Sequence, residues 1–194
     1  MISTRTRFVI LVTLLIPWSL GCDGGGSVRT PTRSANEPVS DSRPYLCDLV
    51  PERALRVVTG YSGPLTSSWD GPQTDNGLCL ASGAVDEWPL GVTWEYRNGE
   101  KTVRLQERNW ADSSPHKIPA ELGRGLAVVA PTAGADRRPN FVIAVFKCGE
   151  KMPWISIDFA RVVRGRDAVQ DMFDFMRIAE KRFGQLHKCT PRAS

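Results

Sequence analysis

The chain begins with an apolar run, and we expect its residues to form no part of a folded domain. Phe8 to Leu20 contain no charged residue, and Arg5 and Arg7 stand just before them. A transmembrane helix needs about 20 apolar residues to cross a hydrocarbon core of roughly 30 Å, so this run is too short. A short apolar run behind a basic flank is typical of a secretory signal peptide. We therefore expect this segment to be removed before the rest of the chain folds.

Ser19-Leu20-Gly21-Cys22 ends the run and resembles a lipobox, the motif whose cysteine receives a diacylglycerol before the signal peptide is cleaved. The resemblance implies a signal peptide over 1–21 and a lipid anchor at Cys22, on the extracytoplasmic side of a cell membrane. Residues 23–44 are mostly Gly, Ser, Thr, Pro and charged residues, so they bury too little apolar surface to offset their ordering entropy. We predict a lipidated cysteine and disordered tether over 22–44, and a single domain over 45–190.

Charge argues against a nucleic-acid partner. Cleavage removes two of the 25 basic residues and leaves 23 against 21 acidic residues, a formal charge of +2. Affinity for nucleic acid depends on clustered Lys and Arg side chains that neutralise phosphates. The mature chain has no basic run, so we expect no nucleic acid among its partners.

The cysteines beyond Cys22 predict a disulfide framework. They are four in number, Cys47, Cys79, Cys148 and Cys189. An even count outside the membrane predicts two disulfides, and the absence of C-x-x-C argues against a zinc ribbon or a thioredoxin-type redox pair. Three connectivities are open. We favour 47–79 and 148–189, because each pair would join a helix end to a strand.

The first half of the domain is expected to begin with a short helix. Pro51 suits its first turn and Gly60 suits the position after its last turn. Val50 stands where a Ser or Thr cap is expected, which costs about 1 kcal/mol relative to a good cap. Residues 61–76 are rich in turn formers, and a short strand is expected over 78–81.

Residues 90–97 predict a strand that continues into a hairpin. Their apolar positions alternate strictly, at Leu90, Val92, Trp94 and Tyr96. Asn98-Gly99 is the strongest short-range signal for a two-residue type I′ turn. The sequence therefore predicts that Trp94 faces Val103, and Val92 faces Leu105, on a second strand.

The remaining elements predict an α+β domain. Strands are expected over 125–130, 141–148 and 154–162, with a polar loop over 131–140. Between Arg166 and Lys188, apolar residues recur at helical spacing, at Val169, Met172, Phe173, Met176, Ala179, Phe183 and Leu186. The same period places Ile178 on the opposite side. We predict an antiparallel β-sheet with a short N-terminal helix and a long C-terminal amphipathic helix packed on it, braced by two disulfides.

This order of features resembles a family of small actinobacterial lipoproteins classed as domain of unknown function 3558. The matching features are the lipobox, the tether, Cys47-Asp-Leu-Val-Pro-Glu at the first helix, Gly60, Cys79 at the first strand, and the closing helix. Two positions differ, since Val50 replaces the usual hydroxyl cap and Ala81 stands where tryptophan is common. The resemblance implies an envelope lipoprotein with an antiparallel sheet and flanking helices, and the family has no assigned catalytic residue.

The sequence gives little support for a catalytic motif. Ser114-Pro-His-Lys117 matches the S-x-x-K pattern of penicillin-recognising enzymes, but the companion S-D-N and K-T-G motifs are absent, which favours a solvated loop. His116 is expected to be exposed, and His187 to lie near a helix C-terminus where a cation is favourable. No group of His, Cys, Asp and Glu has metal-ligand spacing, so we expect no metal and no cofactor.

The aromatic and basic residues of the loops are candidates for a ligand or partner surface. They are Trp69, Trp88, Trp110, Arg137 and Arg138. Tryptophans in turn-rich segments supply stacking surface, and the arginines suit an anionic envelope polymer. The alternatives are tryptophans packed over a sheet edge and arginines solvated in a loop. Asp158, in the middle of a strand, is the one acid expected to be partly enclosed.

Three interpretations of function remain open. The first is a non-enzymatic surface module that binds a protein partner or an envelope ligand, favoured by the lack of a nucleophile–base pair. The second is a small envelope hydrolase with a site around Asp158. The third is a purely structural envelope protein.

Overall fold

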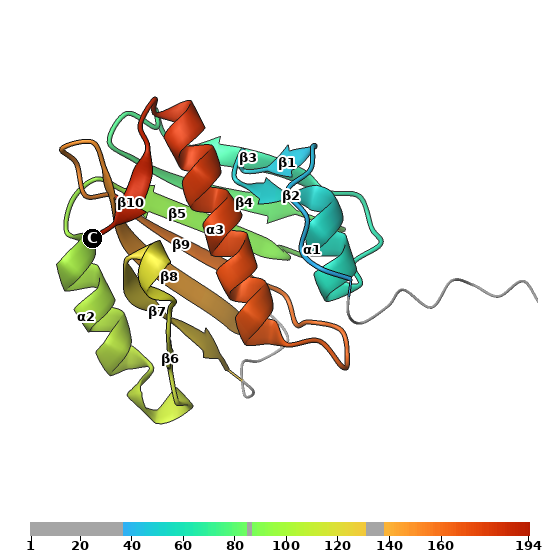
Figure 1. Cartoon of the computed structure of the whole chain (residues 1–194). Helices are drawn as coiled ribbons and strands as arrows, with labels where there is room; N and C mark the ends of the chain where they lie inside the picture. The colour runs from blue at the N-terminus through green and yellow to red at the C-terminus, as the bar shows by residue number, and fades with distance from the viewer. Residues whose placement is uncertain (1–36, 85–86, 131–137) are drawn as a thin grey trace, which may run out of the picture. The chain divides into compact units, whose positions relative to one another are not determined.

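The computed structural model describes residues 37–84, 87–130 and 138–194 (Figure 1). In this part of the chain, one antiparallel sheet has the strand order β3, β4, β5, β9, β8, β7, β6, and β10 pairs with the end of β8. The strands are β3 (Thr66–Asp70), β4 (Asn76–Ser82), β5 (Leu90–Glu95), β6 (His116–Lys117), β7 (Arg124–Val129), β8 (Asn140–Cys148), β9 (Trp154–Phe159) and β10 (Pro191–Ala193). The predicted α+β class is confirmed, and each predicted strand from 78 to 159 is present apart from the second arm of the hairpin.

Strand register fixes which side chains share a face of the sheet. Val92 pairs with Ile157, and Ile157 pairs with Val142, so these three side chains project to the same side. Helices α1 (Glu52–Thr59) and α3 (Ala168–Leu186) cover this side, and the larger core lies beneath them. Figure 1 shows α3 running obliquely across the strands with α1 beside it.

The short helix α1 follows a small two-stranded ladder, β1 (Tyr45–Leu46) and β2 (Val50–Pro51). It ends as predicted at Gly60, whose left-handed φ of 72° is easily adopted without a Cβ. No side chain caps its N-terminus. The expected disulfide between Cys47 and Cys79 joins this region to β4, with Cα atoms 5.8 Å apart.

The second expected disulfide joins Cys148, at the end of β8, to Cys189, just after α3. Its Cα atoms are 5.3 Å apart, so the favoured connectivity is present at both pairs. The bridge holds the last residues of the chain against the sheet, where Pro191 pairs with Cys148. Gly184 permits this approach, because a Cβ there would lie 2.5 Å from the Pro191 ring.

The predicted hairpin at Asn98-Gly99 is wrong. Residues 99–109 form helix α2 (Gly99–Asn109), and both edges of β5 are already paired, with β4 and β9. Asn98 does adopt the left-handed conformation (φ 63°), which asparagine tolerates, but the chain continues as a helix. The segment is rich in Glu, Lys, Arg, Leu and Gln, which favour helix over strand. Val103 is buried while Leu105 is exposed, so one apolar contact anchors the helix.

Helix α2 packs on the side of the sheet opposite α3. Val103 lies in a second, smaller core formed with residues of β7, β8 and β9, namely Leu126, Val128, Ile143, Val145 and Trp154. Two 3-10 turns follow in the chain, η1 (Ala111–Ser113) and η2 (Ala120–Leu122). Because α2 packs on β7, β8 and β9, no helix of the described residues covers the rest of that side.

Helix α3 is present where predicted, but its buried side differs from the expected stripe. Phe175, omitted from that stripe, is fully buried and packs edge-to-face on Phe159 with ring centroids 5.2 Å apart. Ile178, expected on the outer side, is only 8% exposed, whereas Leu186 is 47% exposed. Phe173 is half-buried. A segment outside the sheet also contacts this helix, at Lys181, about one turn after Ile178.

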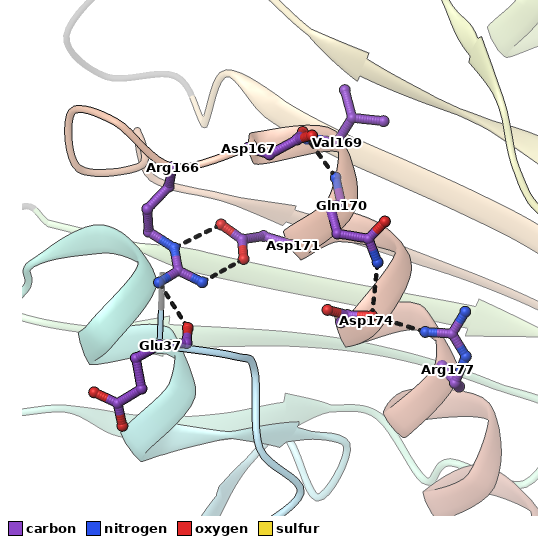
Figure 2. A network of polar contacts seen from close by, with 8 residues as sticks. All are labelled: Glu37, Arg166, Asp167, Val169, Gln170, Asp171, Asp174 and Arg177. Carbon is purple, nitrogen blue, oxygen red and sulfur yellow. Dashed lines mark hydrogen bonds and ion pairs between the residues drawn. The ribbon is translucent and has the colours of Figure 1, made fainter. Parts of the chain in front are cut away.

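That segment comprises residues 37–44, which were predicted to belong to the disordered tether. The Asp41 carboxylate accepts a hydrogen bond from Lys181 Nζ at 2.7 Å, and Arg166 Nη1 donates to the Glu37 carbonyl at 2.9 Å (Figure 2). Val39 packs against the core. The ordered domain therefore extends to at least Glu37, because this segment finds specific partners along α3.

A buried ion pair fixes the start of α3. Arg166 donates to both carboxylate oxygens of Asp171, at 2.8 Å and 2.5 Å, and both side chains are almost fully buried. These hydrogen bonds raise the pKa of Arg166 above its usual value. Asp167 caps the helix by accepting hydrogen bonds from the backbone N–H groups of Val169 and Gln170, as Figure 2 shows. The arrangement ties the N-terminal segment, the capping turn and the helix together.

Several predictions fall on residues outside those that the structure describes. They are the signal peptide over 1–21, the lipidation site at Cys22, the tether up to residue 36, most of the polar loop over 131–140, and Arg137. Among the residues that are described, no helix is long and apolar enough to cross a membrane.

Candidate functional site

The side of the sheet opposite α1 and α3 is only partly covered. Strand register places one set of side chains from β3, β4, β5 and β9 on this side. We call this surface the open face; its residues are Thr66, Ser68, Asp70, Asn76, Leu78, Leu80, Gly91, Thr93, Glu95 and Asp158. Those on β3, together with Asn76 and Leu78, are solvent-exposed, and Leu78 keeps 43% of its surface in water. The open face thus combines short polar side chains with an exposed leucine.

One end of the open face carries a cluster of three residues, each of which the sequence analysis singled out separately. Arg138 donates from Nε to Asp158 Oδ2, and from Nη1 to the Trp88 carbonyl at 3.1 Å. Both side chains of the Arg138–Asp158 ion pair keep about a quarter of their surface exposed. The Trp88 side chain is 48% exposed. Three candidate residues from separate segments, two of them 50 positions apart, therefore meet at one end of the central strands β5, β9 and β8.

Gly91 makes room for this cluster on the neighbouring strand. It pairs with Asp158 across the β5–β9 ladder. A Cβ at Gly91 would lie 2.7 Å from Asp158 Oδ1 and 3.1 Å from Arg138 Nη2. The missing side chain therefore allows the ion pair to lie across β5, and any larger residue would displace it.

The opposite end of the open face holds a shallow pocket of about 350 Å³. Asp70 and Glu95 line it, together with the apolar surface of Leu78 and Trp154. The described residues provide neither carboxylate with an ion-pair partner, and Glu95 accepts only a weak hydrogen bond from Asn98 at 3.3 Å. The pocket therefore offers two exposed acidic groups beside an apolar wall.

The other predicted surface tryptophans lie elsewhere. Trp69 projects to the α1 side of the sheet, where its Nε1–H donates to Asp48 at 3.0 Å. Trp110 is half-buried at the end of α2 and stacks on Phe141, with ring centroids 6.1 Å apart. Of the tryptophans predicted as a surface, only Trp88 presents a largely exposed ring beside the open face.

The histidines and the S-x-x-K motif do not assemble a reaction centre. His116 and Lys117 form the short edge strand β6 and are exposed, as is Ser114. His187 stacks on Phe183 at 4.0 Å and contacts Trp94 edge-on. Burial, and secondarily the nearby charge of Lys151, lowers the pKa of His187. His187 lies at the C-terminal end of α3 as predicted, but the expectation of a favourable cation there is wrong, because burial and the Lys151 charge both disfavour the imidazolium.

The described side chains of the open face can make ionic, hydrogen-bonding and apolar contacts. Asp158 is held by a guanidinium, and neither histidine lies in the cluster that surrounds it. Among the described residues, no group of three or more His, Cys, Asp and Glu side chains is placed to hold a metal ion. A surface with exposed apolar groups, hydroxyls and carboxylates is suited to contact with another molecule.

Sequence reasoning missed two acidic features. Asp70 and Glu95 belong to the pocket only through the β3–β4–β5 register, which no local pattern reveals. Glu180 is buried on the inner side of α3, at 5% exposure. Its signal was present in the sequence, because Glu180 lies four residues after Met176 and three before Phe183, on the apolar stripe.

Comparisons with protein-family models, curated proteins and solved structures found no match to this chain. The resemblance to the actinobacterial lipoprotein family therefore stays a prediction.

Proposed function

We propose that this protein is a non-enzymatic binding module, anchored to the outer face of a cell membrane through a lipid on Cys22. Its open face docks a protein partner that presents a basic side chain to the pocket between Asp70 and Glu95. One observation about the described residues carries the proposal. Asp70 and Glu95, which have no ion-pair partner among them, lie beside the exposed Leu78 on the open face.

Charge and shape favour a basic side chain in that pocket. A Lys or Arg stem packs on apolar walls such as Leu78 and Trp154 while its cationic head reaches carboxylates. The Arg138–Asp158 pair is internally neutralised, so the acidic character of the open face is concentrated at the Asp70–Glu95 end. Trp88 supplies an exposed aromatic surface beside the ion pair, a residue type enriched at binding hot spots.

The anchor and the location are supported by the sequence. The apolar leader, Ser19-Leu20-Gly21-Cys22 and the polar residues that follow are those of an exported lipoprotein. Two disulfides agree with an oxidising compartment. Membership of the domain of unknown function 3558 family belongs to the same proposal.

Site-directed photo-cross-linking in intact cells tests the open face. A photoreactive residue replaces Ser68, which is exposed on β3, and a matched control replaces Arg53, which is exposed on α1. We expect a discrete protein adduct from position 68 and none from position 53. Equal labelling from both positions, or none from either, contradicts docking at the open face.

Charge variants test the occupant of the pocket. Asp70→Asn combined with Glu95→Gln should reduce the position-68 adduct several-fold, whereas Glu107→Gln on the exposed surface of α2 should leave it unchanged. Added salt should weaken wild-type labelling, because exposed charges are screened within about 10 Å at 0.1 M. If the yield of the adduct is unchanged by both the substitutions and the added salt, a basic side chain in the pocket is refuted. A polysaccharide adduct would show that the partner is a polysaccharide and not a protein.

A further inference from the structure

A second pocket lies beside α3, on the helical side of the sheet. Its volume is about 430 Å³, within the range of small-ligand sites. Helix α3 forms one wall, and η2 with residues 189–191 forms the others. The Cys148–Cys189 bridge and the pairing of β10 with β8 hold residues 189–191 in place. The wall formed by residues 189–191 is therefore fixed by covalent and backbone bonds.

Glu180 lines this pocket and has no partner for a buried oxygen. Only 5% of the residue is exposed, and its Oε1 is buried without a hydrogen-bond partner in the described structure. Buried polar atoms are nearly always hydrogen-bonded, since leaving one unpaired is costly. Burial raises the pKa of Glu180 to about 9, so the side chain is a neutral carboxylic acid at pH 7.

The charged groups around Glu180 are already paired with each other. Arg177 binds Glu121 of η2 at 3.1 Å and Asp174 at 2.7 Å. Lys181 binds Asp41 of the N-terminal segment at 2.7 Å. Each of these charged groups at the mouth of the pocket is therefore compensated by another. A charged ligand, whether cation or anion, would find no free opposite charge among them.

We propose that this pocket binds the carboxamide group of a small neutral molecule, with the Glu180 carboxyl group as its hydrogen-bonding partner. A neutral carboxyl group offers one O–H donor beside one carbonyl acceptor, and a carboxamide offers an N–H donor beside a carbonyl acceptor. The hydrogen bond that every carboxamide can form here runs from the carboxyl O–H to the amide carbonyl oxygen, because a substituted amide holds its N–H on the side away from its C=O. Leu122 and Pro191 supply apolar surface for the rest of such a ligand.

This inference is independent of docking at the open face, because the two sites lie on opposite sides of the sheet. Three isosteric probes test it: acetamide, acetate and acetamidinium, which are neutral, anionic and cationic. Titration into the isotopically labelled domain at pH 7, followed by amide chemical shifts, should give saturable shifts at 177–191 with acetamide. Acetate and acetamidinium should bind at least several-fold more weakly. Tighter binding of either ion, or no saturable binding of acetamide, overturns the proposal.

Variants separate recognition by Glu180 from non-specific binding. Glu180→Gln keeps a donor beside an acceptor and should bind acetamide within a few-fold of wild type. Glu180→Met keeps the side-chain volume without these groups and should abolish binding, while Glu107→Met on α2 should leave it unchanged. Retained binding by Glu180→Met contradicts the assignment.

The source of the carboxamide is distinguished by two larger probes. N-acetylglucosamine carries it as a sugar acetamido group, and N-acetylalanine methylamide carries it as a peptide amide. The probe with the lower dissociation constant identifies the source, provided that the Glu180→Met variant loses its binding. If neither probe binds more tightly than acetamide, the ligand is not of either type and the pocket does not recognise a substituted carboxamide.

Discussion

Replacing Glu180 by glutamine is expected to change how stability of the domain depends on pH. The folded state raises the pKa of this carboxyl group from about 4.5 to about 9, chiefly through burial. Between these values the folded protein holds a proton that the unfolded chain releases. The contribution of Glu180 to stability is therefore greatest below about pH 4.5 and is lost as the pH rises toward 9.

The magnitude follows from the proton linkage. One proton taken up on folding changes the unfolding free energy by about 1.4 kcal/mol per pH unit. From pH 4.5 to pH 7 the wild type should lose about 3 kcal/mol through this group alone. Glutamine has the shape of the protonated acid and does not titrate. Glu180→Gln should therefore match the wild type near pH 5 and exceed its stability by about 3 kcal/mol at pH 7.

Urea unfolding at half-unit steps from pH 5 to pH 8 measures this difference. Subtracting the wild-type profile from that of the variant cancels other titrations, including that of His187, whose lowered pKa makes the fold less stable at acid pH. Glu107→Gln, on the exposed surface of α2, serves as the matched control and should give a flat difference. Parallel wild-type and Glu180→Gln profiles would refute the burial of a neutral carboxyl group.

Four further substitutions test other parts of the structure. Phe175→Ala should cost about 3–5 kcal/mol and Ile178→Ala about 2 kcal/mol in denaturant melts; a neutral Ile178→Ala variant would mean that this side chain is not buried. Asp171→Asn leaves Arg166 buried without its carboxylate, so it should cost about 3–5 kcal/mol and speed amide exchange at 37–44; unchanged exchange would show that the ion pair does not hold the segment. Cys22→Ala should abolish partitioning of the expressed protein into detergent, and equal partitioning of variant and wild type would contradict a lipid anchor at Cys22.

The sequence predicted those elements whose signals are local. Alternation over 90–95 and the apolar recurrence over 168–186 were sufficient for strand β5 and helix α3. Gly60 marked the end of α1 correctly. The disulfide pairing followed from the expected order of helix ends and strands. In each of these cases, the residues on which the prediction depended lie within about 20 positions of one another, or they are cysteines.

The failures have tertiary causes. Asn98 adopted the backbone conformation that a hairpin requires, but β9 already occupied the edge of β5 where the second arm would pair. Ile178 was assigned to the outer side although it is buried, and no local pattern predicted that residues 37–44 contact α3 at Lys181, about one turn further along. Long-range contacts decided the hairpin and the ordering of residues 37–44.

The candidate site was predicted only in fragments. Trp88, Arg138 and Asp158 were each singled out, yet their meeting depends on strand register and on the absence of a side chain at Gly91. Asp70 and Glu95 carried no signal, because exposed acids in and beside strands are ordinary. Glu180 was detectable as the one acid within the apolar stripe of the last helix.

Oxidative footprinting in the intact envelope tests the central claim, that the open face is a docking surface, most directly. Leu78 is exposed on the open face and Trp88 beside it, and Leu186 is comparably exposed at the end of α3. Hydroxyl radicals should modify all three residues in the isolated domain. In whole cells we predict that Leu78 and Trp88 become protected while Leu186 stays reactive. Equal modification of all three in both samples would contradict docking at the open face.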